Sequence, residues 1–310
     1  MGFQWLLAIL LLFQQAELPA SLIVEHQGNP IVKMNRTDFM YRLSGIPLID
    51  HEALYQQMED LDKRVKKAPV NATLDGAGRI ISEQEGSKLD RLKFEERFYS
   101  FIFEGGFSRL EAPMQTTYPK VDSELLSMIK VKRIGQYVTY YNSHNKNRSY
   151  NISLAALAIN NYVVFPGEIF SFNKIVGKRT KEKGYLRAPV IVRGEVSEDI
   201  GGGICQISST LFNAVDRAGL QIIERYSHSR NVPYVPSGRD ATVSWYGPDF
   251  VFQNKYNQPI LIRAYANAGQ VIIMICSSEM VNDKQRNVPS ASKKLPAEIK
   301  AEINANQLEP

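Results

Sequence analysis

The stretch that decides the fold is residues 200–214, which read Ile-Gly-Gly-Gly-Ile-Cys-Gln-Ile-Ser-Ser-Thr-Leu-Phe-Asn-Ala. Three consecutive glycines permit positive φ angles and a close approach of the backbone to a neighbour or a ligand. Apolar residues then recur at helical spacing up to Gly219, which is suited to end a helix in the left-handed conformation. The pattern therefore predicts a helix with Cys205 in its first turn.

A cysteine at that position is expected to be reactive. The unpaired N–H groups and the positive end of the helix dipole favour the thiolate, so they lower the pKa of the thiol. The only other cysteine, Cys276, ends the apolar run 271–275, which predicts a buried strand and a core thiol. Two cysteines allow one disulfide at most, and the cysteines and histidines show no zinc-ligand spacing. We therefore expect no metal and no cofactor.

The composition is that of a globular protein with a basic balance. The chain has 310 residues, enough for two domains, with 44% hydrophobic and 22% charged residues. The net charge of +5 and the pI of about 9.0 come from charges spread along the chain rather than from a basic cluster. This spread argues against a nucleic-acid partner and fits an anionic surface such as a cell wall or a membrane face.

The N-terminus predicts export. Residues 5–13 read Trp-Leu-Leu-Ala-Ile-Leu-Leu-Leu-Phe, an apolar run too short to span a bilayer but suited to the core of a signal peptide. Ala20 provides a small residue for cleavage, so residues 1–21 are assigned to a signal peptide or N-terminal apolar segment. An extracytoplasmic location, in the envelope or secreted, follows from this assignment. A peripheral or N-terminal membrane association stays open, and the alternative for this run is a core helix.

Residues 45–118 form the first predicted domain. Apolar residues at helical spacing, Leu92 among them, predict helices over 50–65 and 90–103. A hairpin is predicted between them over 68–82 and a strand after them over 107–117. This unit resembles the peptidoglycan-binding domain that often precedes wall-modifying catalytic domains. The residues that carry the likeness are Leu54, Leu61, Pro69-Val70-Asn71-Ala72, Gly86, Leu89-Asp90 and Leu110-Glu111-Ala112-Pro113. A generic α+β module is the alternative.

Residues 133–278 form the second predicted domain, which is mixed α+β and packs the cysteine helix on an antiparallel sheet. The pattern predicts a further helix over 151–161 and several strands, over 136–141, 162–173, 188–196, 220–226, 250–253, 260–264 and 270–275. Residues 281–310 are polar and rich in lysine and glutamate, which predicts a disordered tail. The fold class of the whole chain is therefore α+β.

The second domain resembles the VanW family, which is named for an accessory protein of vancomycin-resistance clusters. The matching segments are Pro-Gly-Glu-Ile-Phe-Ser-Phe-Asn at 166–173, Gly-Tyr at 184–185, Ala-Pro-Val-Ile at 188–191, Gly-Gly-Gly-Ile-Cys-Gln-Ile-Ser-Ser-Thr-Leu at 201–211 and Gly-Arg-Asp-Ala-Thr-Val at 238–243. The resemblance implies a role in the cell envelope of Gram-positive bacteria, with peptidoglycan or its stem peptides as the partner.

The candidate catalytic residues are Cys205, His228 and Asp240. A thiol nucleophile needs a base that takes its proton and a group that orients the base. The order of cysteine on a helix, histidine after the next strand and aspartate beyond resembles that of transglutaminase-like cysteine hydrolases. In this hypothesis Cys205 attacks a carbonyl, His228 is the general base and acid, and Asp240 holds the imidazole tautomer.

The remaining candidate residues would bind the substrate. Backbone N–H groups of Cys205 and Gln206, and the Gln206 side chain, are candidate oxyanion donors. The full set of substrate-binding candidates is Gly201, Gly202, Gly203, Gln206, Ser208, Ser209, Arg239 and Arg187. Two function classes stay open: a cysteine-dependent acyl transferase or amidase acting on stem peptides, and a non-catalytic peptidoglycan-binding or scaffolding protein associated with glycopeptide resistance or envelope stress. The oligomeric state stays open as well.

Overall fold

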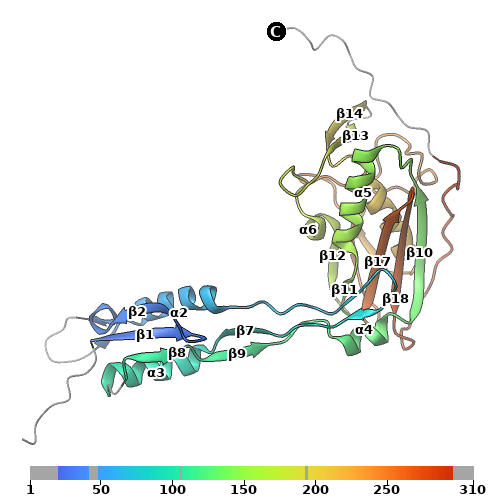
Figure 1. Cartoon of the computed structure of the whole chain (residues 1–310). Helices are drawn as coiled ribbons and strands as arrows, with labels where there is room; N and C mark the ends of the chain where they lie inside the picture. Colours follow the sequence, from blue (N-terminus) through green and yellow to red (C-terminus); the bar gives the residue numbers. More distant parts are fainter. Residues whose placement is uncertain (1–19, 42–47, 105–106, 193–194, 296–310) are drawn as a thin grey trace, which may run out of the picture. The chain divides into compact units, whose positions relative to one another are not determined.

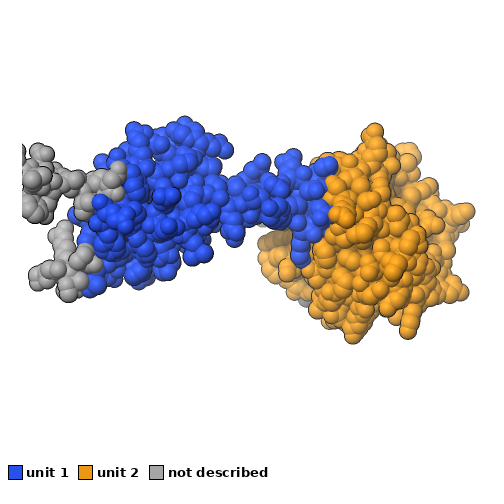
Figure 2. Space-filling view, turned by 90° about the horizontal axis from the view of Figure 1, so that it is seen from below, with its two compact units in different colours: residues 1–72, 82–122 blue, residues 73–81, 123–310 orange. Residues whose placement is uncertain are grey.

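The computed structural model describes residues 20–41, 48–104, 107–192 and 195–295. The chain forms two compact units, one made of residues up to 72 and 82–122 and the other of residues 73–81 and 123 onward (Figure 2). Each unit combines helices with small, mostly antiparallel sheets, so the predicted α+β class is confirmed. The predicted signal segment lies outside the described residues except for its last two positions.

Two helices supply most of the core of the first unit, as their apolar spacing predicts. Helix α2 (His51–Val65) begins after Asp50, whose carboxylate accepts a hydrogen bond from the Ala53 N–H, and it buries Leu54, Met58, Leu61 and Val65. Helix α3 (Arg91–Phe103) is capped by Asp90 in the same way and buries Phe94, Phe98, Phe101 and Ile102. Leu92, which the sequence places on the apolar face of α3, is 81% exposed instead.

The sheet of the first unit contains strands that the sequence analysis missed. Strands β1 (Ser21–His26) and β2 (Asn29–Asn35) form a hairpin, and β8 (Arg109–Glu111) pairs in parallel with β1. The unit thus begins well before residue 45. The short elements η1 (Arg36–Phe39), β3 (Met40–Tyr41) and β4 (Leu48–Ile49) follow the hairpin. The single strand predicted over 107–117 is two strands, because β9 (Met114–Thr117) pairs with β7 (Gly86–Leu89) rather than with β1.

The hairpin predicted over 68–82 is present in a shorter form, and residues 73–81 belong to the second unit. Its strands are β5 (Thr73–Leu74) and β6 (Ile80–Ile81). The Asn161 side chain accepts a hydrogen bond from Leu74 N–H at 3.1 Å and donates one to Leu74 O at 3.0 Å. Arg263 donates to Asp75 O at 2.8 Å. These bonds attach the hairpin to residues far along the chain, which local sequence patterns do not reveal.

The second unit is built on a four-stranded antiparallel sheet. Its strands run in the order β10 (Lys132–Tyr140), β18 (Gln270–Ser277), β17 (Ile260–Asn267) and β11 (Tyr162–Val164), as Figure 1 shows. Helix α7 (Ile204–Arg217) packs on β10 and β18, and α5 (Lys146–Ile159) packs on β17. Helix α4 (Ser123–Ile129) precedes the sheet in the chain. Helix α5 starts earlier than the predicted 151 because the Asn145 side chain caps it by accepting from Arg148 N–H.

A second antiparallel sheet contains β12 (Ile169–Ser171), β16 (Val251–Gln253) and β15 (Gln221–Glu224). The Pro166–Gly167 turn therefore carries the chain from one sheet to the other. Helix α6 (Phe172–Val176) follows β12, and β13 (Arg187–Val192) pairs with β14 (Glu195–Ile200) in a hairpin that leads into the glycines.

Helix α7 is the central element of this unit. Eleven of its residues are buried, from Ile204 through Val215, with the exception of Cys205 at the start. The helix lies so close to β10 that a Cβ added at Gly135 would be 2.4 Å from Ala214 O. Such burial on all sides explains why polar side chains of this helix bond to backbone groups instead of water.

The segment after Met280 corrects the prediction of a disordered tail. Within residues 281–295, Val281 and Val288 are buried in the core of the second unit. Tyr137 donates a hydrogen bond to Pro289 O at 2.8 Å, and Arg217 donates to Val288 O at 2.5 Å. The polar composition of the segment hides these few anchoring residues. Residues 296–310 lie outside the described part of the chain.

Replacing Val288 with alanine is expected to lower the free energy of unfolding by about 2 kcal/mol, because two buried methyl groups are lost. Thermal or urea unfolding of the full chain measures the change. Val131→Ala is the matched control, since Val131 is 55% exposed and its truncation should be nearly neutral. Equal effects of the two substitutions would contradict the docking of this segment.

Candidate active site

Helix α7 begins at a turn made by the three glycines. Gly201 and Gly203 have φ angles of +88° and +104°, in the left-handed region that favours glycine. A Cβ at Gly202 would lie 2.5 Å from Ala188 O and 2.6 Å from Pro189 O. The Asn151 side chain donates to Gly202 O at 3.0 Å and so fixes the turn from α5. The glycines thus let the turn pack against the protein's own backbone, whereas the sequence analysis expected them to make room for a substrate.

This turn places Cys205 in the first turn of α7, as predicted. The thiol is partly buried and free of any disulfide. Its sulfur lies 3.6 Å from Val243 O and 3.9 Å from Thr242 Oγ1. The His228 ring is near enough to the thiol to lower its pKa. The structure therefore brings together the cysteine and the histidine that the sequence analysis paired.

His228 is oriented by Asp240. The His228 ring nitrogen Nδ1 lies 2.6 Å from Asp240 Oδ2, and the same oxygen accepts the His228 backbone N–H at 2.6 Å. The two side chains are 5% and 8% exposed. Because Asp240 engages Nδ1, the nitrogen left to face the thiol is Nε2. The three residues thus form a chain of sulfur, imidazole and carboxylate in the arrangement that nucleophilic catalysis requires.

The electrostatics of the three residues favour a charged pair. Burial raises the pKa of Cys205, but the hydrogen bond and charge of His228 outweigh burial and lower it overall. Burial lowers the pKa of His228, but hydrogen bonds with Asp240 and Cys205 outweigh burial and raise it to about 9. The pKa of Asp240 is lowered, because hydrogen bonds from His228 outweigh the opposing effect of burial. The site therefore favours a thiolate beside an imidazolium.

The first turn of α7 also presents a backbone donor. The Ile204 N–H bonds to Gly201 O and the Gln206 N–H bonds to Gly203 O. Of the two expected backbone oxyanion donors, Gln206 is therefore already engaged. The Cys205 N–H lies among the first four N–H groups of the helix, which have no partner within it. It is the better-placed donor to the oxyanion that forms when the sulfur attacks a carbonyl carbon.

The other polar candidates on α7 are bonded within the protein. The buried Gln206 amide accepts from Arg148 at 2.7 Å and donates to Thr139 Oγ1 and Tyr140 O, both at 3.0 Å. Both of its N–H groups are thus used, so its side chain has no donor left for an oxyanion. Ser208 and Ser209 are buried as well. Ser208 donates to Ala241 O at 2.6 Å, and Ser209 donates to Cys205 O at 2.7 Å and accepts from Ala241 N–H. These serines bond the backbone of Ala241, next to Thr242, to helix α7.

The two candidate arginines are bonded to other groups of the protein. Arg239 bonds to Asn213 Oδ1 at 2.8 Å and to Asp216 at 2.7 Å. Since α7 rises about 1.5 Å per residue, these partners are more than about 10 Å along the helix from Cys205. Arg187 donates to Glu198 O within the β13–β14 hairpin.

The sequence analysis missed several residues that complete the site. Thr242 and Val243 contact the sulfur, and Asn151 holds the glycine turn. Thr242 and Val243 are the last two residues of the 238–243 motif that carries the family resemblance. The motif could therefore have identified them as site residues. Arg225 was also missed; it donates to the backbone O of Asp240 at 2.6 Å and to the carboxylate Oδ1 at 3.4 Å.

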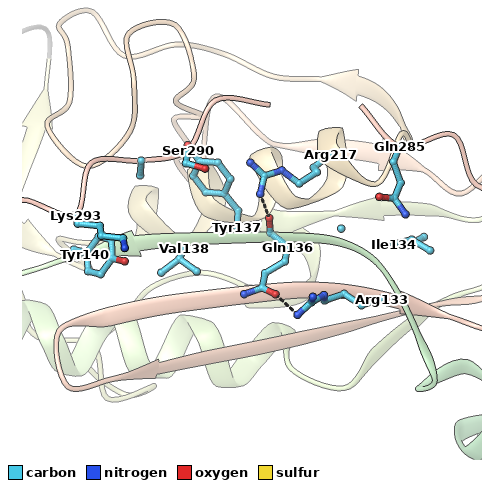
Figure 3. Close-up of a pocket in the computed structure, with 12 residues that line it drawn as sticks. Arg133, Ile134, Gln136, Tyr137, Val138, Tyr140, Arg217, Gln285, Ser290 and Lys293 are labelled. Atoms are coloured by element: carbon cyan, nitrogen blue, oxygen red, sulfur yellow. Dashed lines mark hydrogen bonds between the residues drawn. The ribbon is translucent and has the colours of Figure 1, made fainter. Parts of the chain in front are cut away.

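Neither metal-ligand clustering among the described residues nor the cavity along β10 coincides with this site. Among the described residues no group of three or more histidine, cysteine, aspartate or glutamate side chains is placed to hold a metal ion. A cavity of about 450 Å³ lies along β10 and is lined by residues such as Arg133, Gln136, Arg217 and Lys293 (Figure 3). It includes none of the three candidate catalytic residues. In the described part of the chain, no helix has the length and apolar character needed to cross a membrane.

Comparison with known proteins identifies relatives of the chain. A profile of the family described as VanW like protein matches residues 147–276, which include all three candidate catalytic residues. The chain is 55% identical over 294 residues to the uncharacterized protein YoaR of Bacillus subtilis, covering 95% of this chain and 97% of that protein. It is 34% identical over 106 residues to the vancomycin B-type resistance protein VanW of Enterococcus faecalis, covering 33% of this chain and 38% of that protein. No solved structure matches.

Proposed function

The chain belongs to the family of VanW-like proteins, and on that premise we propose that it is a cysteine-dependent acyl transferase or amide hydrolase acting on peptidoglycan stem peptides in the cell envelope. The observation that carries the proposal is the His228–Asp240 hydrogen bond beside Cys205, whose pKa the histidine lowers.

The proposed reaction uses these residues in two steps. The Cys205 thiolate attacks an amide carbonyl, and the Cys205 N–H stabilises the oxyanion that forms. The C–N bond then breaks, the leaving amine takes a proton from the His228 imidazolium, and a thioester remains on Cys205. In the second step His228 accepts a proton from water or from an acceptor amine, which attacks the thioester and releases the thiolate.

Three observations support an envelope setting. The vancomycin B-type resistance protein VanW is 34% identical to this chain over 106 residues. Residues 5–13 match the apolar core of a signal peptide. The positive net charge suits an anionic wall. The first unit, which resembles a peptidoglycan-binding domain, would hold the chain on that substrate.

A non-catalytic binding role is the second candidate. It is favoured by the glycine turn, which packs on Ala188 and Pro189 of the same chain and therefore needs no ligand to explain it. In this role the domain would recognise peptidoglycan without forming a thioester.

The proposed reaction is expected to have a bell-shaped pH profile. The reactive form is a thiolate beside an imidazolium, so activity should rise as pH passes the lowered pKa of Cys205. It should fall again near pH 9, where His228 loses the proton that the leaving amine needs. Initial rates of fragment turnover from acid to alkaline pH measure the profile. Activity that still rises above pH 9 would contradict the assigned role of His228.

The test of the proposal is incubation of the full chain with purified peptidoglycan fragments, followed by mass spectrometry. The wild-type protein should change the mass of at least one fragment, by gain of water or by exchange of the amine, and Cys205→Ala should leave every fragment unchanged. Fragments that are retained by both proteins but never changed would support the binding role instead.

A further inference from the structure

Arg179 is a charged residue beside the thiol that the sequence analysis did not select. It lies in the loop between α6 and β13, and its side-chain stem passes next to the glycine turn. A Cβ added at Gly201 would be 3.1 Å from Arg179 Cβ and 3.3 Å from its Cγ. The guanidinium interacts electrostatically with Cys205 and lies 5.8 Å from the centre of the Phe172 ring. The stem of Arg179 thus packs against the glycine turn that leads into α7.

Both terminal nitrogens of Arg179 are buried without a hydrogen-bond partner. Among the described residues no other arginine has this feature. The other arginines near α7 are bonded: Arg148 to Gln206, Arg225 to Asp240 and Arg239 to Asp216. A buried guanidinium without partners loses its hydration and gains nothing in exchange, so such a group calls for an explanation.

The neighbouring acid does not neutralise Arg179. Asp249 interacts with it electrostatically, but its carboxylate accepts from Ser171 Oγ at 2.5 Å, Asn173 N–H at 2.9 Å and Phe250 N–H at 2.7 Å. These bonds hold Asp249 to the start of α6, and no ion pair joins it to Arg179 within the described residues. The guanidinium therefore keeps a fork of donors that suits a planar anion.

We propose that Arg179 forms an anion subsite beside Cys205 and binds a carboxylate of the substrate next to the bond that reacts. The inference rests on the proposed function and narrows its substrate class to peptides that carry a carboxylate within a few bonds of the attacked carbonyl. Bound there, the carboxylate would satisfy the terminal nitrogens and place the carbonyl carbon over the sulfur. Arg179 is thus a specificity residue, whereas bond making and breaking belong to Cys205 and His228.

Two alkylating agents of nearly equal size test the subsite without any turnover. Iodoacetate carries a carboxylate one bond from the carbon that reacts, and iodoacetamide carries a neutral amide there. Cys205 and Arg179 are each partly exposed as residues. In Arg179→Gln the ratio of the iodoacetate rate to the iodoacetamide rate at Cys205 is expected to fall about tenfold. Arg179→Lys, which keeps the charge, should retain most of the ratio.

Arg133→Gln is the matched control. Arg133 is exposed at the start of β10. The opposite end of this strand is the one near the site, because the Tyr140 carbonyl there bonds to Gln206. Loss of Arg133 should leave the ratio unchanged. The iodoacetamide rate itself and the unfolding temperature show whether Arg179→Gln has kept the site intact. If that variant does not fold, the wild-type ratio is compared with that of a cysteine peptide, and a wild-type ratio no higher than the peptide's overturns the subsite.

Matched peptides connect the subsite to the reaction. They differ only in a free carboxylate or a carboxamide next to the attacked bond, and wild-type kcat/KM should favour the acid by about tenfold, a preference that Arg179→Gln loses. Failure of each idea gives a different result. Turnover with an unchanged alkylation ratio overturns the subsite and keeps the proposed function. A lowered ratio with no turnover of any fragment overturns the proposed function and keeps the subsite.

Discussion

His228→Ala and Cys205→Ala are each expected to lower the turnover of a responsive fragment by about 10³-fold or more, and the double variant should be no worse than either one. The reason is that the two side chains act as one unit. Without His228, the thiol loses both its lowered pKa and the acid that protonates the leaving amine. Rates for the four proteins, measured by mass spectrometry, complete the cycle.

In His228→Ala, alkylation measures the loss of the lowered thiol pKa separately from the loss of the acid that protonates the leaving amine. At about pH 6.5 the iodoacetamide rate at Cys205 should drop about tenfold or more, because an ordinary thiol with a pKa near 8.5 is only about 1% thiolate there, and its higher intrinsic nucleophilicity recovers part of the loss. His144→Ala is the matched control, because His144 is exposed and bonds to Asn142 in a polar loop. It should change neither the turnover rate nor the iodoacetamide rate at Cys205. Independent, multiplicative effects of Cys205 and His228 would contradict the pairing.

Gly202→Ala is expected to lower the free energy of unfolding by about 3 kcal/mol, a large part of the stability of an ordinary domain. The added methyl group would meet backbone atoms of Ala188 and Pro189 at 2.5 to 2.6 Å. Backbone atoms cannot rotate away as a flexible side chain can, so β13 or the start of α7 must move. Chemical denaturation of the full chain measures the loss.

The matched control for Gly202 is Gly76→Ala in the β5–β6 hairpin of the same unit. A Cβ at Gly76 has no atom within 4 Å, and its φ angle is not in the left-handed region. The control should therefore be nearly neutral. A Gly202→Ala protein as stable as this control would show that the glycine turn does not need its close contact with β13.

The elements of this chain that were predictable from sequence are those whose signals are local. Apolar spacing and the Asp50 and Asp90 caps locate α2 and α3, and the glycine run with Gly219 locates α7. The same spacing misplaces Leu92, because only packing decides where the buried stripe of a helix ends. Strands β1 and β2 were missed because they follow directly on an apolar segment assigned to export.

Long-range pairings account for the remaining differences. The β5–β6 hairpin has an ordinary turn sequence, but its attachment through Asn161 and Arg263 joins residues about 90 and 190 positions apart. The segment after Met280 looks disordered by composition, although Val281 and Val288 are enough to anchor it. Neither feature leaves a periodic signal in the chain.

In the candidate site, too, local sequence signals were predictable and long-range contacts were not. Chain order and the scarcity of histidines select Cys205, His228 and Asp240 as a set, and in the structure His228 bonds to Asp240 and lowers the pKa of Cys205. Residue type alone does not show that Gln206 and Ser208 are bonded inside the protein, because a polar residue on a helix is usually exposed. Arg179 has no sequence motif at all, and only its buried, unpartnered nitrogens reveal it.

The pH dependence of Cys205 alkylation in the wild-type protein shows whether Cys205 is a thiolate stabilised by His228. Cys276 is buried and its pKa is raised by burial, so it is an internal reference in the same sample. Peptide mass spectrometry after short exposure to iodoacetamide follows both thiols. The labelling rate of Cys205 should already be near its plateau at neutral pH, while Cys276 should react little. A rate at Cys205 that climbs tenfold per pH unit through neutrality, as for an ordinary thiol, would contradict this stabilisation of the thiolate.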